Sequence, residues 1–160
     1  MVVSSKSTSD AKTTLPPNPN SPHSTINIVE HEIRKAGGTA TSIRVDTRYP
    51  DQIAHAVAET ERIYGRLDVV VYNAGAIWWS SVEETPMKRF RLMQQVNPEG
   101  LYATVQAALP CFGRNGWKGR IVVVSPPIYS RFFRGKTAYA MGIVFFSLPD
   151  VSLEHFLTAA

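Results

Sequence analysis

The run LDVVVYNAG at residues 67–75 most constrains the fold of this chain. Its apolar residues do not alternate with polar ones, and such runs are typical of strands covered on both faces of a parallel sheet. A second run, GRIVVVSPP at 119–127, has the same character and ends in two prolines. Both runs therefore predict buried strands of a layered domain.

Helical patterns separate the predicted strands. We expect one helix within 24–38, a second over 50–65 and a long third one over 86–112. Thr85 has the position of a cap for the third helix. Pro98 has no N–H to donate, so it must disturb that helix.

Two shorter apolar stretches complete the pattern. MVVSS at 1–5 and TSIRV at 41–45 predict strands, and the alternation of strands with helices predicts an α/β domain with a mostly parallel sheet. Between them, residues 6–24 are rich in Ser, Thr, Pro and Asn, which predicts a disordered loop.

Composition excludes several classes of protein. The chain has 160 residues, 44% of them hydrophobic, and its one cysteine excludes a disulfide framework and favours a reducing, cytoplasmic compartment. No apolar run approaches the ~20 residues of a membrane-spanning helix. The net charge of +4 is spread along the chain without a recognition motif, so no nucleic-acid partner is expected. The four histidines show no metal-binding spacing.

Three of the predicted strands end in polar or small residues. These are Asp46, the turn Asn73–Ala74–Gly75, and Ser125. Ligands of parallel α/β sheets bind at the carboxyl ends of the strands. The sequence therefore predicts a ligand site at that edge.

With NAG after an apolar strand, Asn97 in the long helix, VVVS on the next strand and then Tyr139, the chain resembles the short-chain dehydrogenase/reductase family. The resemblance runs from Met1 to about Gly142 and is closest to the hydroxysteroid dehydrogenase-like branch. It implies a Rossmann-type doubly wound parallel sheet and NADP or NAD as cofactor. It also implies hydride transfer between the nicotinamide and an alcohol or carbonyl carbon of a small-molecule substrate.

The resemblance also implies roles for single residues. The expected catalytic residues are Tyr139 as general acid/base, Asn97 in the proton relay, and Ser125. Lys6 is expected to meet a 2′-phosphate, which favours NADP. The full set of expected cofactor-binding residues is Ser5, Lys6, Asp46, Asn73, Ala74 and Gly75.

The chain departs from the family pattern in three places. Ile143 stands where the family has the lysine that lowers the pKa of the tyrosine. Pro126 stands at the position of the catalytic serine, so Ser125 and Ser130 are both candidates for it. No glycine-rich phosphate-binding turn is present, because the chain begins where the second strand of the family would begin.

These departures predict an incomplete domain. We expect residues 1–142 to form a partial Rossmann domain that lacks the first strand and the C-terminal part, and 143–160 to be a tail unlike the family. A catalytically incompetent fragment is the expected outcome. The alternative is an interaction module that associates with a full-length relative, or with itself, through the 86–112 helix. Trp78 and Trp79 either line a substrate pocket or cover a loop.

Overall fold

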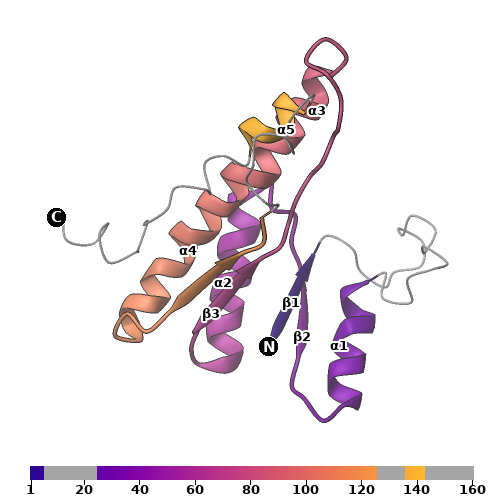
Figure 1. The fold of residues 1–160 in the computed structure, drawn as a ribbon. Helices are drawn as coiled ribbons and strands as arrows, with labels where there is room; N and C mark the ends of the chain where they lie inside the picture. Colours follow the sequence, from indigo (N-terminus) through magenta and orange to yellow (C-terminus); the bar gives the residue numbers. More distant parts are fainter. Residues whose placement is uncertain (6–24, 126–135, 143–160) are drawn as a thin grey trace. The chain divides into compact units, whose positions relative to one another are not determined.

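Strands and helices alternate along the chain in the predicted order. The computed structural model describes residues 1–5, 25–125 and 136–142. The elements are β1 Val2–Ser5, α1 Ile26–Lys35, β2 Thr41–Arg44, α2 Pro50–Tyr64, β3 Val69–Tyr72, α3 Met87–Gln94, the π-helical turn η1 Gln95–Glu99, α4 Gly100–Arg114, β4 Arg120–Val123 and α5 Thr137–Met141 (Figure 1). The expected α/β class is confirmed. The predicted loop 6–24, Ser130 and the predicted tail 143–160 lie outside the described residues.

The strands form two parallel pairs. β1 and β2 pair in register from Val2 opposite Thr41 to Ser5 opposite Arg44. In the second pair, β3 and β4, the N–H groups of Arg120 and Val124 donate to the carbonyls of Asp68 and Tyr72 at 2.8 and 3.0 Å. Both bonds have the same offset along the two strands, as a parallel pair requires.

The chain divides into two compact units. The first comprises Met1–Val70 and Tyr102–Arg120, and the second comprises Val71–Leu101 and the residues from Ile121 onward. In the first unit, α1 lies beside β1 and β2 (Figure 1). The buried core of this unit is Val45, Ile53 and Ala56, against which Ile43, Ala103 and Ala107 pack.

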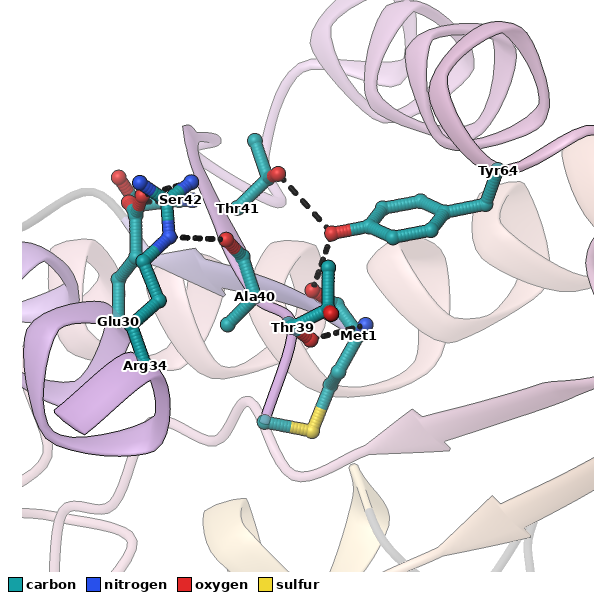
Figure 2. Close-up of polar contacts among 8 residues, drawn as sticks. All are labelled: Met1, Glu30, Arg34, Thr39, Ala40, Thr41, Ser42 and Tyr64. Carbon is teal, nitrogen blue, oxygen red and sulfur yellow. Dashed lines mark hydrogen bonds and ion pairs between the residues drawn. The ribbon is translucent and has the colours of Figure 1, made fainter. Parts of the chain in front are cut away.

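Polar contacts hold the amino end of the first unit (Figure 2). The ammonium group of Met1 donates to the Thr39 carbonyl at 2.8 Å, and the Thr41 N–H donates to the Met1 carbonyl at 2.9 Å. The Tyr64 hydroxyl, at the end of α2, donates to that same carbonyl at 3.1 Å and lies 3.0 Å from the Thr41 hydroxyl. One tyrosine therefore joins α2 to β2 and to the residue that precedes β1.

The two ends of α2 agree with the sequence rules for helix termini, whereas the start of α3 does not. Pro50 opens α2, and Gly65 ends it in the left-handed conformation with φ 75°, which glycine adopts without steric cost. The expected cap at Thr85 is wrong, because Pro86 occupies the N-cap position of α3. The Thr85 hydroxyl instead donates to the Ser81 carbonyl at 2.6 Å and so stabilises the preceding turn.

In the second unit, α3 packs beside α5 (Figure 1). The buried cluster between them is Met93, Ala138 and Tyr139, with Ala76, Trp78 and Phe90 packed against it. Within the described ranges, no helix is both long and apolar enough to cross a bilayer.

The β3–β4 pair corrects one expectation. The apolar runs predicted strands covered on both faces, but Val71, Val122 and Val124 are 60, 49 and 59% exposed. Side chains alternate between faces along a strand, so Val122 and Val124 share one face of β4. No described residue covers that face well enough to bury these valines.

Candidate active site

A hollow of about 320 Å³ lies where β3 and β4 end in the second unit. Six of the predicted site residues line it together: Asn73, Ala74, Gly75, Asn97, Ser125 and Tyr139. Small-molecule pockets typically measure about 300–1,000 Å³, so the hollow has room for one end of a dinucleotide. Four chain segments thus contribute predicted residues or their neighbours to one site.

Asn97 is placed by a break in the long helix. Pro98 cannot donate a hydrogen bond, and the helix widens to the π-helical turn η1 at this point. The Asn97 side chain is only 6% exposed. Its Oδ1 accepts the Ala76 N–H at 2.8 Å, and its Nδ2 donates to the Ala76 carbonyl at 3.1 Å. Both functions of the amide therefore hold the loop that follows β3.

Tyr139 lies on α5 and is 6% exposed. Burial raises the pKa of its hydroxyl above the usual value of 10.0. Gly142 allows α5 to come close to the long helix, since a Cβ there would lie 3.3 Å from Gln94 Nε2 and 3.5 Å from Asn97 Nδ2. The phenol is thus held protonated at neutral pH, where it donates hydrogen bonds but is a poor base.

Two cations of this unit lie on tryptophan rings. The Lys136 ammonium, at the N-cap of α5, is 4.6 Å from the Trp79 ring centroid, and the Arg89 guanidinium is 4.4 Å from that of Trp78. Neither tryptophan lines the hollow. Trp78 packs against the buried cluster of Met93, Ala138 and Tyr139, whereas Trp79 is 61% exposed.

Two predicted cofactor residues, Ser5 and Asp46, belong to the first unit. Ser5 ends β1 opposite Arg44. The Asp46 carboxylate, just beyond β2, accepts the Arg48 N–H at 3.1 Å and the Arg48 Nε at 2.8 and 3.1 Å. This hydrogen bonding raises the pKa of Arg48. Lys6 lies outside the described residues, so its predicted contact with a 2′-phosphate stays a prediction.

Sequence reasoning missed part of the lining. Tyr72, Ile77, Val123 and Val124 also face the hollow. Tyr72 looked like an ordinary strand residue, although its position directly before Asn73 was a usable signal. Among the described residues, no three His, Cys, Asp or Glu side chains come together as a metal site would require.

The comparisons with known proteins identify a family. The family model "short chain dehydrogenase" matches residues 20–141. The chain is similar to hydroxysteroid dehydrogenase-like protein 2 of Mus musculus, with 40% identity over 104 residues, which are 65% of this chain and 21% of that protein. The chain therefore spans about a fifth of the length of that relative.

Solved structures show the same fold. A short chain dehydrogenase from Mycobacterium thermoresistibile matches with a TM-score of 0.74 and 34% identity, over 89% of this chain and 48% of that one. An alcohol dehydrogenase from Thermococcus sibiricus, complexed with 5-hydroxy-NADP, matches with a TM-score of 0.70 and 20% identity, over 88% of this chain and 53% of that one. At that identity the second likeness bears on the fold alone. The expected incomplete Rossmann-type fold is confirmed.

Proposed function

Because the chain belongs to the short-chain dehydrogenase family, whose cofactors are NAD and NADP, we propose that its hollow is the nicotinamide end of such a cofactor site. The parent activity is oxidoreduction, with hydride transfer between the nicotinamide and an alcohol or carbonyl carbon. The observation that carries the proposal is the gathering of the Asn73–Gly75 turn, Asn97, Ser125 and Tyr139 around one hollow.

The residues present fit a flat ring. A Cβ built on Gly75 would meet no atom within 4 Å, so the backbone of the turn is open to close approach. Ser125 and Tyr139, whose side chains carry hydroxyl groups, line the same hollow. When bound, the nicotinamide would supply the hydride or accept it. Tyr139 would hold the proton at the substrate oxygen, and Asn97 would keep the loop in place through Ala76.

We further propose that this chain alone is catalytically incompetent. A general base must lose its proton near the working pH, and burial moves the pKa of Tyr139 the wrong way. The family resemblance assigns the opposite shift to a lysine, where this chain has Ile143. Among the described residues no cation lowers the pKa of Tyr139, so its phenol is a poor base at neutral pH.

We also propose the domain bounds, the preference for NADP, a cytoplasmic location and a substrate class. The family match over 20–141 supports a partial domain over 1–142 followed by a tail from 143. NADP rather than NAD rests on Lys6, and a cytoplasmic location rests on the single cysteine. The substrate is proposed only as a small alcohol or carbonyl compound.

An NMR titration tests the cofactor site. Backbone amides of the labelled 160-residue chain are followed during addition of NADPH, with adenosine 2′,5′-bisphosphate as a probe that lacks nicotinamide. We expect shifts at residues 73–77, Asn97 and Tyr139 with NADPH only. Absence of shifts in these residues at millimolar NADPH would overturn the cofactor proposal.

A second experiment tests incompetence. Wild-type chain should not consume NADPH with a panel of carbonyl substrates. Ile143→Lys should lower the pKa of Tyr139, seen as phenolate absorbance near ~295 nm that Tyr139→Phe removes. Ile143→Gln is the uncharged control. Turnover by the wild-type chain that Tyr139→Phe abolishes would contradict this part of the proposal.

The second candidate function is association through the long helix. Tyr102 on α4 is 72% exposed and Met87 on α3 is 58% exposed, so both large side chains are open to contact with a partner. Sedimentation velocity over a hundredfold concentration range is the test. We expect a mass that rises with concentration in the wild type and stays monomeric in Tyr102→Glu. A concentration-independent monomer would exclude this function.

A further inference from the structure

The turn Asn73–Gly75 is held at both ends by one turn of the long helix. Tyr72, just before it, donates its hydroxyl hydrogen to the carbonyl of Val96. Ala76, just after it, is hydrogen-bonded through both its N–H and its carbonyl to the side chain of Asn97. Consecutive residues of η1 thus hold the two residues that flank the turn.

The π-helical turn changes the backbone hydrogen bonds beside Val96. In an α-helix the Val96 carbonyl would accept the N–H of Gly100, four residues later. Here the Gly100 N–H is directed to the carbonyls of Asn97 and Gln95. The Tyr72 hydroxyl donates to the Val96 carbonyl within this irregular part of the helix.

The ring of Tyr72 and its hydroxyl group make different contacts. The residue is 6% exposed, and it lines the hollow together with the turn. Its hydroxyl, however, bonds to the helix backbone. Removing the hydroxyl alone would therefore act on a ligand only through the position of the turn.

We propose that Tyr72 is a positioning residue, which fixes the Asn73–Gly75 turn against η1 and thereby sets the affinity of the hollow for the nicotinamide end of a cofactor. Asn97 fixes the far side of the same turn, so the two side chains act as one bracket. The affinity part of this inference rests on the proposed function, whereas the bracket itself does not.

Tyr72→Phe tests the bracket, because it keeps the ring and removes the hydroxyl. Amide hydrogen exchange is followed by NMR in the folded chain. We expect exchange at Gly75 and Ala76 to become about tenfold faster, the effect of one lost hydrogen bond. Tyr49→Phe is the matched control, since Tyr49 is 48% exposed and precedes α2 in the first unit. Unchanged exchange at Gly75 and Ala76 in Tyr72→Phe would overturn the inference.

A double-mutant cycle with Asn97→Ala separates positioning from general stability. Two residues that act on one turn should not be additive. We expect Tyr72→Phe to weaken NADPH binding severalfold in the wild-type background and to add almost nothing in Asn97→Ala. Full additivity would overturn the bracket. Failure of the wild type to bind NADPH would refute the proposed function, and the exchange measurement would then decide the bracket.

Discussion

The amino-terminal strand pair and the β3–β4 pair are both short and parallel, but they are stabilised differently. β1 and β2 have a helix beside them and a buried core of Val45, Ile53 and Ala56 in the same unit. At the carboxyl end of β3, the side chains of Tyr72 and Asn97 form hydrogen bonds on either side of the Asn73–Gly75 turn. In the first unit, packing stabilises the strand pair. In the second unit, side-chain hydrogen bonds stabilise the turn that follows β3.

The exposed valines indicate that burial stabilises the β3–β4 pair less than it stabilises the β1–β2 pair. Parallel sheets are normally covered on both faces, since burial of apolar side chains is the main favourable term in folding. Val71, Val122 and Val124 are half exposed or more. This face contributes little to the stability of its unit, so substitutions there should matter far less than substitutions in the first core.

The largest expected effect is that of Ile53→Ala. Ile53 is 4% exposed in the core of the first unit, and removing such a side chain costs about 2–5 kcal/mol. Val124→Ala is the matched change on the exposed face, with an expected cost within about 0.5 kcal/mol. Urea denaturation followed by circular dichroism measures both.

The comparison would fail if the two variants lost similar stability. A cost above about 1.5 kcal/mol for Val124→Ala would mean that this valine is buried in solution. Hydrogen exchange by mass spectrometry, read separately for peptides of each unit, would locate the loss.

Sequence patterns predicted the elements well because each depends on local chemistry. Pro50, Gly65 and Pro98 act through their own backbone, and the structure places a helix start, a helix end and a π-helical turn at these residues. The exposed face of β3 and β4 was not predictable, because a run of valines does not show what packs on it. Thr85 is not the cap because α3 begins one residue later than predicted, with Pro86 at the N-cap position.

The sequence predicted which residues come together at the site, but not the contacts that each of them makes. Strand ends in parallel sheets meet at one edge, which is why the Asn73–Gly75 turn and Ser125 come together with Asn97 and Tyr139. The contact between Tyr72 and Val96 was not predictable, because it depends on where the π-helical turn places the Val96 carbonyl in space. The burial that raises the pKa of Tyr139 likewise comes from packing between helices.

A smaller effect is expected from Tyr64→Phe. The variant keeps the ring but removes the hydroxyl that contacts Met1 and Thr41 (Figure 2). The contacts are partly exposed to water, so the expected loss is about 0.5–1.5 kcal/mol. Thermal unfolding measures it, and exchange should rise in the β1–β2 pair but not at residues 73–77. Equal loosening of both regions would show that the two units do not respond separately.

The smallest expected effect is the acid dependence that Glu30 gives the first unit. Hydrogen bonds from Ser42, its hydroxyl first and then its backbone N–H, lower the pKa of Glu30 below its usual 4.5. A carboxyl group with a lowered pKa in the folded state stabilises the fold above the unfolded value, and this contribution is lost as the pH falls through the folded value.

Glu30→Gln should therefore be less stable than the wild type near neutral pH, and the difference should shrink below pH 4.5. Ser42→Ala should weaken the same acid dependence, because it removes the hydroxyl that contributes most to the shift. Urea midpoints measured from about pH 7 to about pH 3 provide the test. Parallel curves for the wild type and Glu30→Gln over that range would mean that the Ser42 contact does not persist in solution. The first unit would then depend on its apolar core rather than on the polar contacts beside β2.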